Sequence, residues 1–276
     1  MQSLVNHLVQ LQELTLIRDE HRATGDGSHL ARLNDSIDQL TDRLPAAVRS
    51  LYQRLYKKDH IVMAPVHDGS CAICGMRLPI SQVQAVRLRK ELQNCPSCAR
   101  MLYEASESAR WVGEKPSRNE PRRAGIVRFS AQDLMAPQIE ASTGEDAIRT
   151  LAERMATEGF VDDARKLIAA ALEREAILST AMDNGLAFPH VRGVEGGGLT
   201  LAVGTSRKGV AFGEAPPVHI VCFLTIPTAV SAFYLKLLAG LTEVMLKEQN
   251  RTAILAATTP EQLWKALTKA ARYTIK

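Results

Sequence analysis

The sequence predicts a multidomain protein: an α-helical hairpin, a small cysteine-rich unit, and a C-terminal α/β domain whose mixed sheet is flanked by helices. Three observations predict it. Apolar residues recur at helical spacing through the first part of the chain, two Cys-x-x-Cys pairs follow, and strand-like apolar runs then alternate with helical stripes. The chain has 276 residues and 46% apolar content, which is enough for more than one hydrophobic core.

The N-terminal helices are predicted from the spacing of leucine, isoleucine and valine. One stripe covers residues 4–17, two glycines interrupt it within residues 23–28, and a second stripe covers residues 30–55. The second spacing is close to a heptad repeat, and Pro45 should start a new turn or kink the helix. We therefore expect residues 1–62 to form a helical hairpin or short coiled coil that serves as an interaction surface or spacer.

Two Cys-x-x-Cys pairs make up the cysteine-rich unit, namely Cys71, Cys74, Cys95 and Cys98. Four thiolates at this spacing can surround one Zn²⁺ tetrahedrally. Disulfides are the rival explanation, but a two-residue spacing closes a strained loop and no secretory signal opens the sequence. Because cysteine fills all four positions, we expect a structural zinc in a C4 zinc ribbon over residues 63–105. Gly75 follows the first pair, where a turn with positive φ is often needed.

The hairpin and the cysteines together resemble the bacterial coiled-coil C4-type zinc-ribbon proteins. Residues 74–80, 86–87 and 95–103 carry the resemblance. It implies a regulatory protein partner for the hairpin and leaves RNA or DNA as a further partner of the ribbon. The cations that could meet phosphates are Arg77, Arg87, Arg89, Lys90 and Arg100. Tyr103 is the one aromatic candidate for base stacking, so a docking or purely structural ribbon remains the alternative.

Charge is spread unevenly along the chain. Residues 1–128 hold 19 Lys and Arg against 14 Asp and Glu, whereas residues 129–276 hold 15 against 16. A polyanionic partner of the N-terminal half or simply a solvated basic face explains this. Residues 106–128 lack apolar periodicity and are expected to be a basic flexible linker. The longest uncharged run, residues 220–235, is too short for a membrane span, so we expect no membrane insertion and a cytoplasmic location.

The α/β domain is expected over residues 129–276. Thr143 and Thr259 each have the sequence context of a helix N-cap, and Pro260 suits the first turn of the last helix. The nearly all-apolar run at residues 218–226 predicts a central strand. The other expected elements are a strand at 199–205 and helices beginning near residues 144, 162, 229 and 260.

His190 is the candidate reactive residue of this domain. It follows Pro189, at the end of a small-residue turn and a short apolar run. A histidine held by its backbone in this way titrates near neutral pH and is a good nucleophile. On the Pro-His pair alone, a partly buried structural histidine is the competing interpretation.

The whole domain resembles the type 2 (fructose–mannitol) EIIA domain of the bacterial phosphoenolpyruvate-dependent phosphotransferase system, including its nitrogen-regulatory member. The motifs that carry the resemblance are residues 173–175, 179–180, 184–185, 189–192 and 212–213. It implies that His190 accepts a phosphoryl group from an HPr-like carrier protein, with Arg174 as the active-site arginine. Thr180 and Asn184 match the turn that shapes the pocket, and Arg192 is a second candidate cation for phosphate oxygens.

One position departs from the family pattern. Tyr234 stands where the family has a second histidine, and a phenol cannot supply a cation near pH 7. His219, at the start of the central strand, is the candidate to compensate, against the alternative of a strand-end histidine with no role. The sequence therefore predicts a cytoplasmic regulatory phosphocarrier, favoured because no permease segment accompanies it. The alternative is a non-catalytic zinc-ribbon adaptor or nucleic-acid-binding regulator that uses a degenerate EIIA domain for docking.

Overall fold

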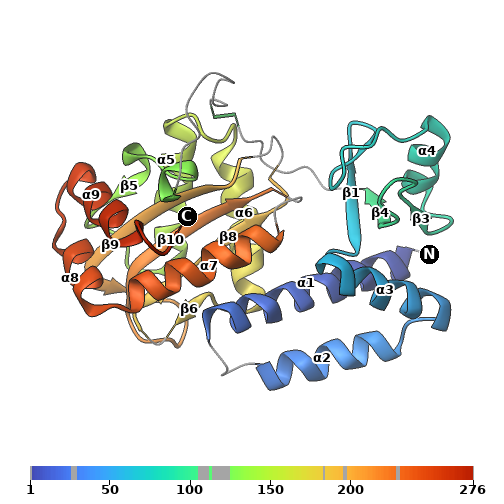
Figure 1. Ribbon diagram of the computed structural model, residues 1–276, viewed down its shortest axis with the longest axis horizontal. Coiled ribbons are helices and arrows are strands. Elements are labelled where there is room, and N and C mark those ends of the chain that lie inside the picture. The colour runs from blue at the N-terminus through green and yellow to red at the C-terminus, as the bar shows by residue number, and fades with distance from the viewer. Residues whose placement is uncertain are drawn as a thin grey trace. The chain divides into compact units, whose positions relative to one another are not determined.

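The computed structural model describes residues 2–25, 30–104, 112–113, 125–182, 184–194, 198–227 and 231–275 (Figure 1). The chain divides into two compact units. The N-terminal unit comprises residues 1–107 with 228–238, and the C-terminal unit comprises residues 108–227 with 239–276. Most of the linker predicted at residues 106–128 lies outside the described residues.

Three helices open the N-terminal unit: α1 (Gln2–Thr24), α2 (Leu30–Asp42) and α3 (Ala46–Asp59). α1 packs against α2, and their apolar stripes enter a common core that includes Leu8, Leu11 and Ile37. Pro45 is the N-cap of α3, because its fixed φ suits the start of a helix and not its interior. The predicted break at Pro45 is confirmed, and the second arm of the expected hairpin is two helices.

The ribbon contains a four-stranded sheet with the order β2-β1-β4-β3. Strands β1 and β4 are parallel, and the other two pairs are antiparallel. Its elements are β1 (Met63–His67), β2 (Ser70–Cys71), α4 (Ile80–Leu88), β3 (Gln93–Asn94) and β4 (Met101–Glu104).

A buried glutamine of α1 connects the helices to the ribbon. The Gln12 side-chain oxygen accepts hydrogen bonds from the Val62 and Met63 amides, each at 2.7 Å, and its amide nitrogen donates to the Met63 carbonyl at 3.3 Å. On the other side of the ribbon, Arg100 donates to the Ile61 carbonyl at 3.0 Å. Buried backbone groups are costly without partners, so these bonds fix the start of β1 against α1.

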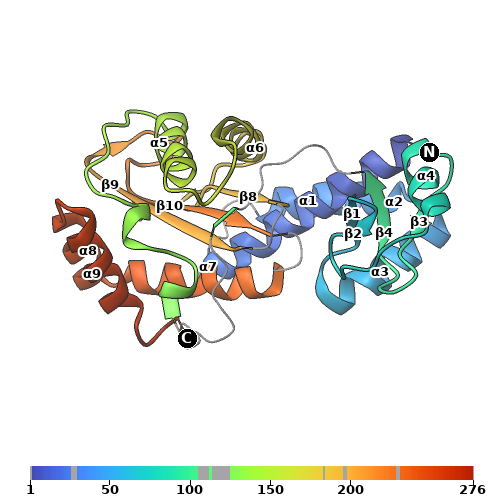
Figure 2. The same cartoon turned by 90° about the horizontal axis from the view of Figure 1, so that it is seen from above.

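The C-terminal unit is a mixed sheet with the order β5-β9-β10-β7-β6, and β8 also pairs with β10. β10 is central and almost wholly buried, as its apolar sequence predicts. Helices α5 and α6 cover one face of the sheet, and α7, whose residues from 239 onward belong to this unit, covers the other (Figure 2). The strands are β5 (Met135–Ala136), β6 (Ala181–Met182), β7 (Leu186–Ala187), β8 (His190–Arg192), β9 (Thr200–Val210) and β10 (Val218–Ile226). The helices are η1 (Gly125–Arg128), η2 (Gln132–Leu134), α5 (Gly144–Thr157), α6 (Ala164–Ile177), α7 (Ser231–Leu246), α8 (Glu248–Ala256) and α9 (Pro260–Ala271).

The predicted helix caps are confirmed. The Thr143 hydroxyl accepts from the Asp146 amide at 3.2 Å, and the Asp146 carboxylate accepts from the Thr143 amide at 3.1 Å, which completes a capping box. The Thr259 hydroxyl accepts from the Gln262 amide at 3.2 Å at the start of α9. The fold class predicted from sequence is confirmed in both units. No helix in the described part of the chain combines the length and the apolar character needed to cross a membrane.

Candidate functional site

The candidate site lies where two short strands follow one another along β10. Leu186 of β7 pairs with Ile220, and His190 of β8 pairs with Leu224, so both strands keep the same register on β10. Pro189 lies between them and has no N–H to donate to the ladder. The ladder therefore lacks one donor just before His190, while the Pro189 carbonyl still accepts from the Leu224 amide at 3.0 Å.

The His190 imidazole is held at both ring nitrogens. Its Nδ1 lies 2.9 Å from the Phe188 carbonyl oxygen, which can only accept, so Nδ1 carries the proton and donates. Arg174 Nε donates to the other ring nitrogen, Nε2, at 3.3 Å. This pairing fixes the tautomer in which Nε2 carries the lone pair. Nε2 is thus the nucleophilic atom of the ring.

Arg174 lies in the last turn of α6, and the backbone of Leu178 anchors its side chain. Its Nη1 donates to the Leu178 carbonyl at 2.8 Å, which holds the guanidinium beside the imidazole. The bond from Nε to His190 is long for an N–H donor and correspondingly weak. A fixed planar cation beside the nucleophilic nitrogen suits the oxygens of a phosphoryl group.

Glu175 organises the turn that follows α6. One carboxylate oxygen accepts from the Ser179 hydroxyl and from the Thr180 amide, both at 2.8 Å, and the other accepts from the Thr180 hydroxyl at 2.7 Å. The Thr180 carbonyl in turn accepts from the Phe188 amide at 3.2 Å. A chain of hydrogen bonds therefore runs from Glu175 through Thr180 and Phe188 to the imidazole of His190.

Glu175 was not predicted as a site residue. It stands in the motif with Arg174, and its two hydroxyl partners follow four and five residues later. An acidic residue at that distance from Ser-Thr is the signal that identifies it, because a short loop brings the hydroxyls back to its carboxylate. The predicted pocket residue Thr180 is buried, and its hydroxyl is already bonded to Glu175.

The other predicted pocket residues lie in three different elements. Asn184 is exposed in the turn before β7, where Gly185 has a φ of +72°. Arg192 is half-buried at the end of β8. Tyr234 is fully buried in α7. Their roles in the pocket stay predictions.

His219 is not placed to compensate for the missing second histidine. Leu224, the β10 partner of His190, lies five residues further along the strand, or about 16 Å at 3.3 Å per residue. The Nδ1 of His219 lies 2.9 Å from the Ser206 carbonyl instead. Strand rise therefore separates the two residues, which favours the alternative interpretation of His219 as a strand-end histidine over that of a substitute.

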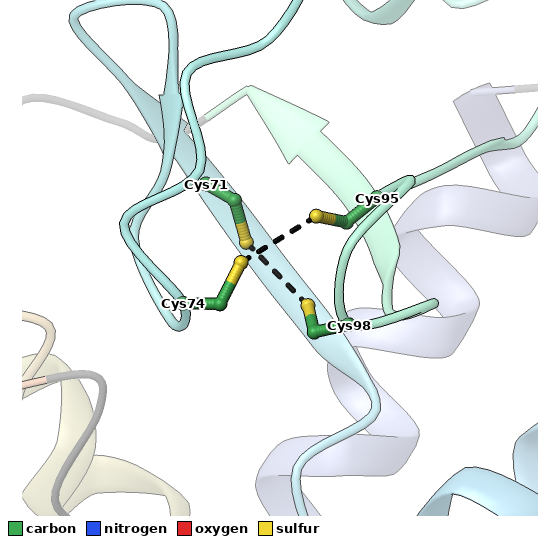
Figure 3. Close-up of side chains that lie close together, drawn as sticks. All are labelled: Cys71, Cys74, Cys95 and Cys98. Carbon is green, nitrogen blue, oxygen red and sulfur yellow. Dashed lines mark hydrogen bonds between the residues drawn. The ribbon is translucent and has the colours of Figure 1, made fainter.

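The four cysteines of the ribbon converge on one point (Figure 3). Their sulfur atoms all lie within 4.8 Å of one another, with Cys71 and Cys98 at 3.8 Å and Cys74 and Cys95 at 3.6 Å. A tetrahedral zinc with Zn–S bonds of about 2.3 Å places its sulfurs about 3.8 Å apart. The donor set and its geometry therefore fit the structural zinc that the sequence predicts.

The two cysteine pairs adopt the same tight turn. The Gly75 amide donates to the Cys71 carbonyl and the Ala99 amide to the Cys95 carbonyl, both at 2.9 Å. Gly75 has a φ of +73°, as predicted, and Ala99 has a φ of +63°. Alanine gives no sequence signal for this conformation, which costs an L-residue roughly 1–2 kcal/mol. Both turns point backbone amides toward the thiolates.

Three of the five cations predicted to meet phosphates are engaged within the ribbon. Arg100 is buried, its pKa is lowered by burial, and it forms an ion pair with Asp59. Arg87 and Arg89 both form ion pairs with Glu104, at 3.5 and 3.6 Å. These contacts reduce the positive charge that the ribbon can offer to a nucleic acid.

Two family models match separate parts of the chain. The model of the family "Phosphoenolpyruvate-dependent sugar phosphotransferase system, EIIA 2" matches residues 129–270, which is just over half of the chain. The model of the C4-type zinc ribbon domain matches residues 70–102. With the four converging sulfurs, the second match establishes the unit as a zinc ribbon with a structural metal.

Relatives of known name match the C-terminal part of the chain. The chain is 30% identical over 148 residues to the PTS system 2-O-alpha-mannosyl-D-glycerate-specific EIIABC component of Escherichia coli (strain K12), covering 51% of this chain and 22% of that protein. It is 26% identical over 134 residues to the PTS system fructose-specific EIIA component of Haloferax volcanii, covering 48% and 87%. The chain thus spans about a fifth of the length of the first relative and most of the second.

Among solved structures, the nitrogen regulatory protein IIA-Ntr from Neisseria meningitidis is similar with a TM-score of 0.47 and 18% identity. The match covers 52% of this chain and 99% of that chain.

Proposed function

The chain belongs to the EIIA 2 family of the phosphoenolpyruvate-dependent sugar phosphotransferase system, and from this membership we propose that it is a phosphocarrier whose acceptor atom is Nε2 of His190. The donor is an HPr-like carrier protein. The pairing of the imidazole between Phe188 and Arg174 is the observation that carries the proposal. It leaves the lone pair on the nitrogen that faces the guanidinium.

The transfer follows from this geometry. The lone pair of Nε2 attacks phosphorus, and the N–P bond to His190 forms as the bond between phosphorus and the donor side chain breaks. The electron pair of that bond leaves with the donor. Nδ1 keeps its proton, so the phosphorylated ring is positive, and the Phe188 carbonyl stabilises it by accepting the hydrogen bond.

Arg174 has two successive tasks in this scheme. Its Nε occupies the lone pair of Nε2 in the resting site, so it must release that contact before attack. The guanidinium then pairs with the equatorial oxygens as charge develops on the transferring group. The anchoring bond to Leu178 keeps it within reach throughout.

Direct phosphorylation tests this function. The purified chain is incubated with phosphoenolpyruvate, enzyme I and HPr, and its intact mass is measured before and after acid treatment. We expect an acid-labile gain of one phosphoryl group that is absent from His190→Ala and retained in the matched control His219→Ala. An adduct that persists in His190→Ala, or no adduct with cognate donors, refutes the assignment.

We further propose that phosphorylation is a regulatory mark read by the N-terminal unit. The support is that one chain carries both an EIIA 2 domain and a zinc ribbon preceded by helices. Hydrogen exchange of the phosphorylated and unphosphorylated chains tests the idea. Regulation through this unit requires altered exchange in peptides from residues 2–104, and identical exchange there refutes it.

A docking adaptor that does not transfer phosphate is the second candidate, and Tyr234 favours it. A buried phenol in the position of the second family histidine removes a potential cation from the site. Under this function His190 receives no phosphoryl group, while partner binding depends on the folded domain. The same phosphorylation experiment separates the two candidates.

A further inference from the structure

A groove of about 280 Å³ lies within the N-terminal unit, between α1 and the end of β4. Val5 and Val9, one helical turn apart on α1, form one apolar wall, and Leu102 and Tyr103 of β4 contribute to the other. Val5, Val9 and Tyr103 pack on the hydrophobic core but remain only half-buried. The groove therefore offers apolar surface that the unit itself does not cover.

The strand beside this groove has an open edge. β3 pairs only with Met101 and Leu102, so across the described residues no strand continues the ladder beside Tyr103 and Glu104 on that side. The Met101 amide donates to Val62, toward β1. Since backbone groups alternate in direction along a strand, the amide and carbonyl of Glu104 face the open edge. Such an edge can accept an additional strand.

The rim of the groove is acidic, in contrast to the basic N-terminal half of the chain. Glu13, Glu91 and Glu104 line it with exposed side chains. Arg89 is the only cation among the lining residues, and it is paired with Glu104. Burial together with the nearby Glu13 carboxylate raises the pKa of Tyr103 to about 12, so the phenol adds no further negative charge at neutral pH.

We propose that this groove binds an extended segment of a partner protein in which apolar residues alternate with lysine or arginine. The backbone of this segment pairs with the amide and carbonyl of Glu104 at the end of β4. Its apolar side chains lie on Val5 and Val9, and its cations reach the carboxylates of Glu13 and Glu91. Main-chain hydrogen bonds supply affinity in this mode, and the alternate side chains supply specificity. The inference does not depend on phosphorylation of His190.

Peptide selection on the full chain tests the proposal. A phage-displayed library of random decapeptides is selected on the zinc-loaded protein, and enriched peptides are labelled for fluorescence anisotropy. We expect them to alternate apolar and basic residues. The double charge reversal Glu13→Lys/Glu91→Lys should weaken their binding at least about tenfold, since each attraction to a peptide cation is replaced by a repulsion.

The matched control is Asp35→Lys/Asp38→Lys, which makes the same charge change on exposed positions of α2 outside the groove. Bound peptide should also protect the Glu104 amide from hydrogen exchange. The proposal is overturned if both double variants lose affinity equally, if selection yields no basic alternation, or if the Glu104 amide stays unprotected. Displacement of the peptide by single-stranded oligo(U) identifies the surface as a nucleic-acid site and overturns it as well.

Discussion

His190 is prepared for attack by two neighbours that act on opposite sides of one ring. The Phe188 carbonyl fixes the proton on Nδ1, and Arg174 donates to Nε2; in the proposed transfer its guanidinium pairs with the phosphoryl oxygens. A lysine at position 174 keeps the charge but loses the planar fork and the anchoring geometry. The consequences of these contacts can be measured one residue at a time.

Arg174→Lys should slow phosphorylation of His190 about tenfold to a hundredfold, because a positioned donor to the developing charge is lost. Rapid-quench measurement with phosphorylated HPr as donor gives the rate. Arg165→Lys, at the opposite end of α6, is the matched control and should react at the wild-type rate. Equal rates for both variants contradict a role of the guanidinium in transfer.

Glu175→Ala should affect the His190 imidazole indirectly, through the hydrogen bonds that connect Glu175 to it by way of Thr180 and Phe188. Removal of the carboxylate leaves the Ser179 and Thr180 groups without their acceptor and should lower the free energy of unfolding by about 2 kcal/mol. We also expect the ¹⁵N chemical shifts of His190 to move toward a mixture of tautomers. The exposed neighbour Glu173→Ala serves as control. Unchanged His190 shifts in Glu175→Ala limit Glu175 to a purely structural role.

At the scale of helices and strands, sequence patterns were sufficient where a single pattern runs unbroken to the end of the element. The expected strand at 199–205 is too short by comparison, since β9 continues to Val210. The bounds of β10 and the cap of α5 follow from an unbroken apolar run and from the Thr143 motif. Strands of two or three residues such as β7 and β8 have no periodicity to detect, because their existence depends on pairing with β10. The hydrogen bonds of Glu175 and the positive φ of Ala99 were not predicted for a related reason. Both depend on residues that become neighbours only in the folded chain.

The capping box of α5 predicts a specific pH dependence. Hydrogen bonds from Thr143 hold the pKa of Asp146 below its ordinary value of 3.8. A carboxylate with a lowered native pKa stabilises the fold above its ordinary pKa, and this stabilisation is lost as pH falls through the native value. Thr143→Ala removes the hydroxyl that caps α5 and should therefore destabilise the start of this helix at neutral pH.

Urea unfolding of wild type and Asp146→Asn from about pH 7 to about pH 3 measures the ionised contribution. The stability difference between them should shrink toward the acid end of this range. A difference that stays constant with pH shows that ionisation of Asp146 does not matter to the helix start.

At the scale of the whole molecule, a bound metal contributes folding free energy that the small hydrophobic core of the ribbon cannot provide. The core around the cysteines is limited to a few side chains, among them Leu78, Val86 and Leu102. Small units of this kind depend on metal binding for much of their folding free energy. The hydrogen bonds of Gln12 and Arg100 at the start of β1 then connect the ordered ribbon to the helices.

Cys95→Ser should abolish stoichiometric zinc binding and unfold the ribbon. Metal content after denaturation, measured with a chromogenic chelator, should fall from one zinc ion per chain to far less, and thermal unfolding should begin earlier. Cys222→Ser is the matched control, since Cys222 is buried in β10 and burial raises its pKa to about 12. Equal zinc content in the two variants contradicts the four-cysteine site.

The shared register of β7 and β8 along β10 makes chain length itself a determinant of the site. A deletion or insertion of one residue between Ala187 and His190 moves the imidazole to the opposite face of the sheet, away from α6 and Arg174. A substitution in this segment keeps the register of His190 on β10, whereas a change in its length does not. Homologous proteins that retain this pocket should therefore have the same number of residues between the positions of Ala187 and His190, even where the residues themselves differ.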